Sequence, residues 1–175
     1  MNSPYMGDFR VSQCQTPDHD GLDLVGIDSK EIHSTAAGIV IFAGWENPND
    51  HTQGFGQYVC IKSDDDGLYY YYGHLSEVRV QYGTKVHITD VIGIEGSTGH
   101  STGSHCHYCI RPKYAAGEAL STPIISGIPN EIGVYNDGYV VTKTERGYVN
   151  VTYPHQIKIS CTIDDHEYSG LITEV

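Results

Sequence analysis

Short β-type segments separated by turn residues recur through residues 1–112, and no other feature constrains the fold as strongly. They are rich in Val, Ile and Tyr and are bounded by Gly, Asn or Asp; examples are "IVIFAGW", "QYVCIKS" and "LYYYYGHLS". No stretch before residue 113 has the 3.6-residue apolar period of an amphipathic helix. The pattern predicts an all-β domain, sandwich-like or barrel-like. Within it, the tyrosines at 69–72 are expected to alternate between core and surface.

The 175 residues suffice for one compact domain with a small appendage. We expect the main domain in residues 1–117. Residues 118–135 contain several Pro and Gly and are predicted to be a connector with a short helical turn. Residues 136–175 are predicted to form a small, β-hairpin-rich appendage, whose last hairpin turns at Asp164–Asp165.

The net charge of −12, with its Lys and Arg scattered singly, argues against a nucleic-acid partner and against docking on anionic membranes. No apolar run is long enough to span a bilayer. The five cysteines are an odd number without the spacing of a disulfide framework, which favours synthesis in a reducing compartment. Residues 1–20 lack the apolar core of a signal peptide, so synthesis in the cytoplasm is expected. The sequence does not indicate an oligomeric state.

Two histidines, His105 and His107, lie one residue apart in a predicted strand, "SHCHYCIRP". Side chains at i and i+2 of a strand point to the same face. Two imidazoles would make a poor apolar core but a good metal site. Upstream, His19 and Asp23 are spaced by four in "HDGLD", where Gly21 lets the backbone turn so that the two side chains can converge. Imidazole and carboxylate ligands suit Zn²⁺ with an open position for water.

The motifs H-x-G-x-D, Y-G-H-L-S and G-x-S-T-G-x-H-x-H follow one another in this order. This arrangement resembles the lysostaphin-type (LytM-like) zinc metalloendopeptidases, which cut peptides in bacterial cell walls. The resemblance covers roughly residues 7–112, including "GIVIFAGW" and "FGQYVCIK". It implies an antiparallel β-sheet domain with a substrate groove, a catalytic domain within residues 1–117, and a Zn²⁺ cofactor.

The resemblance also implies roles for individual residues. His19, Asp23 and His107 would bind the zinc ion, and His74 and His105 would flank the reactive water. The implied partner is a stem peptide or cross-bridge of peptidoglycan, with loops 45–57 and 96–104 as walls of the groove. With no visible signal peptide and a short C-terminal extension, the chain looks like a phage or prophage lysin that acts at the bacterial cell wall after release by another agent.

The sequence departs from the family pattern at two cysteines, Cys106 and Cys109, and it has no evident counterpart, around residues 13–15, of a tyrosine that often precedes the first ligand. Cys106 and Cys109 also form a C-x-x-C pair, a spacing used in structural zinc and redox sites. On a strand, however, positions i and i+3 point to opposite faces, so the two sulfurs should diverge. A non-catalytic binding or scaffold domain of the same fold, or another zinc amide hydrolase acting on peptidoglycan, remain alternatives.

Overall fold

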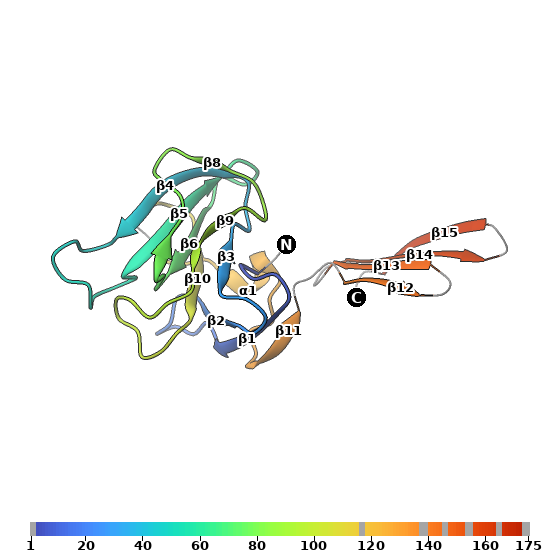
Figure 1. Cartoon of the computed structure of the whole chain (residues 1–175), viewed down its shortest axis with the longest axis horizontal. Coiled ribbons are helices and arrows are strands. Elements are labelled where there is room, and N and C mark those ends of the chain that lie inside the picture. Colours follow the sequence, from blue (N-terminus) through green and yellow to red (C-terminus); the bar gives the residue numbers. More distant parts are fainter. Residues whose placement is uncertain are drawn as a thin grey trace.

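A computed structural model describes residues 3–115 and 118–136, together with the backbone of four C-terminal strands. Eight strands form one sheet in the order β11-β1-β2-β10-β6-β5-β4-β8, and every neighbouring pair is antiparallel (Figure 1). Their bounds are β1 (Asp8–Gln13), β2 (Leu22–Gly26), β4 (Gly38–Trp45), β5 (Gln57–Ser63), β6 (Tyr69–Gly73), β8 (Lys85–Val86), β10 (Cys106–Arg111) and β11 (Gly133–Asn136). The predicted all-β, antiparallel class is confirmed.

A second, three-stranded sheet supplies part of the same core. It runs in the order β3-β9-β7, with β3 (Glu31–His33), β9 (Val91–Ile94) and β7 (Glu77–Val78). Ile32 and Ile92 from this sheet are fully buried and belong to the cluster that includes Leu22, Leu24 and Tyr108 of the large sheet. The core therefore lies against one face of the large sheet, and the opposite face is left for other contacts.

Strand periodicity divides the side chains between these two faces. In β6, Tyr70 and Tyr72 join the main core, while Tyr71 points the other way into a smaller buried cluster with Tyr58, Cys60 and Cys109. The expected alternation between core and surface is therefore wrong for this run: its faces do alternate, but Tyr70, Tyr71 and Tyr72 are all buried. Aromatic side chains from β4, β5 and the loop before β5 cover the second face at this end of the sheet.

Residues 118–135 contain more structure than a simple connector would need. The expected helical turn is present as α1 (Thr122–Ser126), which begins with a proline in its first turn and ends at Gly127 in the left-handed region. β11 follows and pairs with β1 as an edge strand of the large sheet. Side-chain bonds from Gln15 to the backbone of Leu120 and Thr122 further tie this segment to the main domain.

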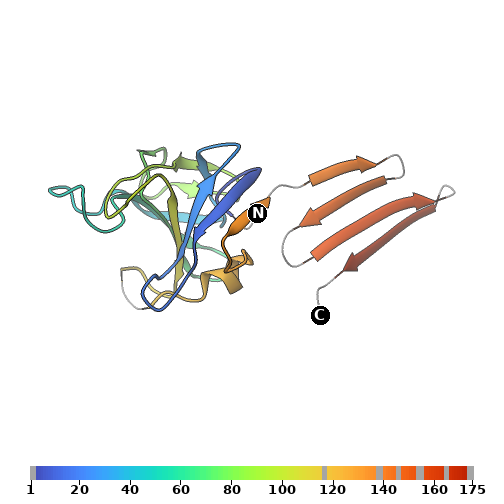
Figure 2. The ribbon, with the colours of Figure 1, turned by 90° about the horizontal axis from the view of Figure 1, so that it is seen from below.

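The predicted C-terminal hairpins are present as four strands, β12 (Val140–Thr144), β13 (Gly147–Thr152), β14 (Gln156–Ile163) and β15 (His166–Ile172). They pair antiparallel in chain order as a sheet of their own, seen as a ladder of successive strands in Figure 2. The expected turn at Asp164–Asp165 lies outside the described residues. The predicted domain boundaries at 117 and 135 stay predictions.

Candidate metal and catalytic site

The register of the large sheet places one row of residues across its open face. Asp23 in β2 lies directly opposite His107 in β10, and His107 in turn lies opposite Gly73 in β6. On the other side, Gln13 in β1 pairs with Asp23. Because Asp23 and His107 have core-facing neighbours on both sides along their strands, strand alternation directs both toward the open face.

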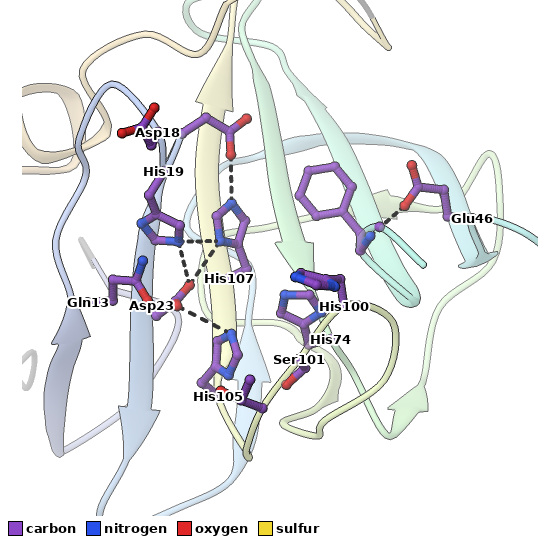
Figure 3. Close-up of a pocket in the computed structure, with 14 residues that line it drawn as sticks. Gln13, Asp18, His19, Asp23, Glu46, His74, His100, Ser101, His105 and His107 are labelled. Carbon is purple, nitrogen blue, oxygen red and sulfur yellow. Dashed lines mark hydrogen bonds and ion pairs between the residues drawn. The ribbon is translucent and has the colours of Figure 1, made fainter. Parts of the chain in front are cut away.

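His19 precedes β2 and completes a tight cluster with these two residues (Figure 3). Its Nε2 lies 3.1 Å from Asp23 Oδ1 and 3.1 Å from His107 Nδ1, and His107 Nδ1 lies 2.9 Å from the same carboxylate oxygen. The side chains of Asp23 and His107 are buried, and that of His19 is half-buried. Three potential ligand atoms thus converge at one point on the open face of the large sheet.

The outer nitrogen of each imidazole already has a partner, and that partner sets the tautomer. His19 Nδ1 lies 2.9 Å from the main-chain oxygen of Cys14, which can only accept, so Nδ1 carries the hydrogen. His107 Nε2 lies 3.1 Å from Oδ1 of Asp20, so Nε2 donates to that carboxylate. In the neutral imidazoles, His19 Nε2 and His107 Nδ1 therefore each carry a lone pair, and these two atoms face each other and Asp23.

Three facing acceptors repel one another unless a cation lies among them. Without a metal the cation is a proton. Burial lowers the pKa of His107, but hydrogen bonds with Asp20 and Asp23 outweigh burial and raise its pKa well above the usual value. The hydrogen bond with Asp23 likewise raises the pKa of His19. Conversely, burial raises the pKa of Asp23, but its hydrogen bonds to His107 and His19 hold that pKa below the usual range. Two imidazoles and one carboxylate are also a catalytic zinc donor set.

His74 and His105 lie beside this cluster, with their rings 4.7 Å apart. His74 follows β6 with φ +63°, in the left-handed region, which turns the chain out of the strand at this point. Its Nδ1 donates to the main-chain oxygen of Thr98 at 2.7 Å, and Nδ1 of His105 donates to that of Gly103 at 2.8 Å. Both rings are thus fixed with the hydrogen on Nδ1, and Nε2 of His105 lies 3.5 Å from Asp23 Oδ2.

Burial, and then the charge of His105, lower the pKa of His74 to about 4. His74 is therefore neutral at neutral pH, with an unprotonated Nε2. A neutral imidazole held in one tautomer beside a cation site can accept a proton from a nucleophile.

All five residues line one cavity of about 460 Å³, shown in Figure 3. As expected, loops 45–57 and 96–104 supply walls, through Glu46, Gly54 and Phe55 on one side and His100, Ser101 and Thr102 on the other. The loops are bonded to each other: Gly99 N donates to His51 O, and His100 N donates to Gly54 O, each at 2.9 Å. The walls of the groove are therefore linked as one unit.

Sequence reasoning missed three residues at this site. Asp20 and Arg111 form an ion pair next to His107, and Gln13 lines the cavity beside Asp23. By alternation Gln13 belongs with Phe9 and Val11 in the core, but a register shift between Val11 and Gln13 turns it to the groove. Asp20 could have been found from the sequence, because it is a carboxylate between His19 and Asp23 in "HDGLD". Nothing in the local sequence identifies Arg111.

The two cysteines of the C-x-x-C pair diverge, as predicted. Cys106 lies in the main core and Cys109 in the smaller cluster on the opposite face, and both are fully buried. Cys109 does lie close to Asp20 and His107, so these three form a second group of potential ligands, on the Nε2 side of His107.

Within the part of the chain that the structure describes, no helix has the length and apolar character of a membrane span.

Comparison with known proteins places this geometry in context. The sequence profile of peptidase family M23 matches residues 17–120, more than half of the chain. The chain is 31% identical over 90 residues to glycyl-glycine endopeptidase ALE-1 of Staphylococcus capitis, covering 51% of this chain and 24% of that protein. It is 28% identical over 115 residues to peptidoglycan DD-endopeptidase ShyA of Vibrio cholerae, covering 65% of this chain and 25% of that protein.

A solved structure agrees with the fold. The catalytic domain of a point mutant of the prophage-encoded M23 protein EnpA from Enterococcus faecalis superposes with a TM-score of 0.57 at 29% identity. The match covers 69% of this chain and 94% of that domain. The chain thus spans nearly a whole catalytic domain, but only about a quarter of the length of the two curated relatives.

Proposed function

The chain belongs to peptidase family M23, and from this we propose that it is a zinc-dependent endopeptidase that hydrolyses peptide bonds in bacterial cell-wall peptidoglycan. The observation that carries the proposal is the convergence of three lone-pair atoms, from His19, Asp23 and His107, beside two imidazoles held in one tautomer. Such an arrangement is unfavourable without a cation and is useful for hydrolysis with one.

His19, Asp23 and His107 would hold the metal through His19 Nε2, a carboxylate oxygen of Asp23 and His107 Nδ1. When bound there, Zn²⁺ supplies a Lewis acid that makes water nucleophilic near neutral pH and polarises the scissile carbonyl. Three protein ligands are the number usual at catalytic zinc sites, which would leave room for a water molecule or substrate. Burial of Asp23 and His107 keeps competing water away from two of the three ligands.

His74 and His105 are assigned the proton transfers. Both rings line the cavity, and the low pKa of His74 leaves its Nε2 unprotonated at neutral pH. One ring accepts the proton of the attacking water, and the proton is then delivered to the leaving amine. The protonated ring stabilises the negative charge that develops on the carbonyl oxygen.

The substrate is an extended stem peptide or cross-bridge that lies between loops 45–57 and 96–104. The names of the relatives, one a glycyl-glycine endopeptidase and one a peptidoglycan DD-endopeptidase, support this substrate class. Because one solved neighbour is prophage-encoded, we further propose action at the cell wall after release, in the manner of a phage lysin. A non-catalytic scaffold of the same fold would not need His74 and His105 fixed beside the ligands.

Zinc analysis and wall digestion by a set of alanine variants test the proposal. His19→Ala, Asp23→Ala and His107→Ala should each lose most of the approximately one Zn²⁺ per chain, because each removes a ligand. His74→Ala and His105→Ala should retain zinc but lose turnover by about 10²–10⁴-fold. The two losses should not add fully, since both rings act on one proton path.

His87→Ala is the matched control, since the His87 side chain is 74% exposed and does not line the cavity. Mass analysis of the muropeptides identifies the bond: an endopeptidase creates new peptide termini, whereas an amidase separates sugar from peptide. Wild-type turnover in both His74→Ala and His105→Ala would exclude the assigned mechanism. Full zinc retention in all three ligand variants would exclude the metal site.

A further inference from the structure

Asp20 supplies the carboxylate that fixes the tautomer of His107, a proposed metal ligand, and the side chain of Cys109 also hydrogen-bonds to this imidazole. His19 is oriented by a main-chain carbonyl, that of Cys14, and that contact survives any substitution at residue 14 that preserves the backbone. His107 instead depends on the Asp20 carboxylate, 3.1 Å from its Nε2. The two ligands are therefore held in different ways, and only one of the two contacts can be removed by substitution.

Arg111 holds the Asp20 carboxylate in place. Its guanidinium forms an ion pair with Oδ2 of Asp20, while Oδ1 faces His107. The same guanidinium lies over the rings of Phe55 and Tyr71, with 5.5 and 5.3 Å between its carbon and the ring centroids. Since Arg111 stacks on two aromatic faces and is only 19% exposed, it provides a fixed anchor for a carboxylate that is 42% exposed.

Main-chain geometry brings Asp20 and Arg111 next to His107. β2 and β10 are neighbours in the sheet, and Gly21 lets the turn before β2 approach β10 closely: a Cβ there would lie 2.9 Å from His107 Nε2. Asp20 therefore reaches the outer side of His107, away from the point where the three ligand atoms converge.

We propose that Asp20, anchored by Arg111, is a positioning residue that holds His107 as the Nε2–H tautomer and so presents Nδ1 to the zinc ion. The inference deepens the proposed function and rests on it for the identity of the metal. Hydrogen-bond partners of metal-bound histidines commonly orient the ring and raise its basicity. Arg111 binds Oδ2 of Asp20, so Oδ1 remains to accept the hydrogen bond from His107 Nε2.

The nearby group of Asp20, His107 and Cys109 offers a rival interpretation, a second metal site on the Nε2 side. A cation there would have to displace the Nε2 hydrogen and would lie beside the positively charged guanidinium of Arg111. The positioning role requires neither change. It predicts that Cys109 is not a zinc ligand.

Zinc affinity of the full chain, measured by competition with a chromophoric chelator, is the first test. Asp20→Ala should weaken zinc binding by about 10–100-fold, the usual effect of losing such a partner. Asp20→Asn keeps an acceptor oxygen for Nε2–H and should restore part of the loss. Arg111→Met should weaken binding less than Asp20→Ala, since it removes only the anchor. Asp18→Asn, at an exposed carboxylate lining the same cavity, should bind zinc like the wild type. Cys109→Ala should retain zinc and weaken binding less than Asp20→Ala, because Cys109 is not a ligand.

Long-range ¹H–¹⁵N spectra of the zinc-loaded protein provide a readout that a merely structural role would not change. The wild type should show a proton on Nε2 of His107 and a metal-shifted Nδ1, whereas Asp20→Ala should lose that single state. Wild-type affinity and an unchanged His107 signal in Asp20→Ala would overturn the proposal, as would loss of zinc in Cys109→Ala. If the wild type binds zinc with this Asp20 dependence but releases no peptide from peptidoglycan, the proposed function fails while the positioning role stands.

Discussion

Gly21→Ala should damage the metal site by forcing the backbone of the turn away from β10, without replacing any proposed ligand. An added Cβ at residue 21 would lie 2.6 Å from the carbonyl oxygen of Tyr108, 2.8 Å from Cβ of Cys109 and 2.9 Å from Nε2 of His107. The first two atoms belong to β10 and cannot rotate away. Reaching an ordinary contact of 3.4 Å from the Tyr108 oxygen requires a separation larger by 0.8 Å (3.4 − 2.6) between the turn and β10.

This displacement exceeds the tolerance of a functional site, which is about 0.5 Å. His19 and Asp23 belong to the same segment of chain as Gly21, whereas His107 belongs to β10, so the shift separates the proposed ligands. We expect zinc affinity to fall by at least about tenfold, in line with the 10–100-fold range for loss of ligand orientation. Overpacking should also cost about 1–3 kcal/mol of unfolding free energy, offset in part by about 0.4–1 kcal/mol from the lower chain entropy of alanine in the unfolded state.

The assay is urea unfolding of the metal-free protein, paired with zinc competition on the folded protein. Gly103→Ala provides the control, because it makes the same substitution in a loop beside the site where no atom lies within 4 Å of the added Cβ. Gly103→Ala should leave zinc affinity unchanged. If Gly21→Ala matched Gly103→Ala in both stability and affinity, the close approach of the turn to β10 would not be what holds the ligands together.

Two further predictions concern pH and chain length. Because the pKa values of His107 and His19 are raised in the folded metal-free protein, their contribution to stability is present below the ordinary pKa of about 6.5 and is lost as pH rises through the raised values. Urea unfolding at a series of pH values above about 6.5 should show this loss without zinc and little of it with zinc. Equal pH dependence in the two forms would contradict the prediction. A chain ending at Asn136 should keep wild-type zinc affinity. A chain ending at residue 117 should still bind zinc but unfold at a lower urea concentration, because it lacks the β1–β11 pairing and the hydrogen bond from Ile110 N to Thr122 Oγ1. Equal unfolding midpoints for the two chains would contradict this prediction.

The sequence by itself determined the features that depend on local alternation and turn chemistry. The segments "GIVIFAGW" and "QYVCIKS" coincide with β4 and β5, because β-branched and aromatic runs bounded by turn residues leave few other conformations. The shared face of His105 and His107, and the divergence of Cys106 from Cys109, follow from the two-residue period of a strand. The resemblance then named five residues, all of which line one cavity.

Only the tertiary structure decided which residues support that cavity. Asp20 and Arg111 are 91 positions apart, and the pairing of β2 with β10 brings them together beside His107. A register shift in β1, not the alternation of its side chains, turned Gln13 into the groove. Tyr71 is buried because aromatic residues from β5 and the loop before it cover the second face of the sheet, and strand parity cannot report what covers a face. Register, bulges and coverage are set by contacts between distant segments, so no local pattern in the chain encodes them.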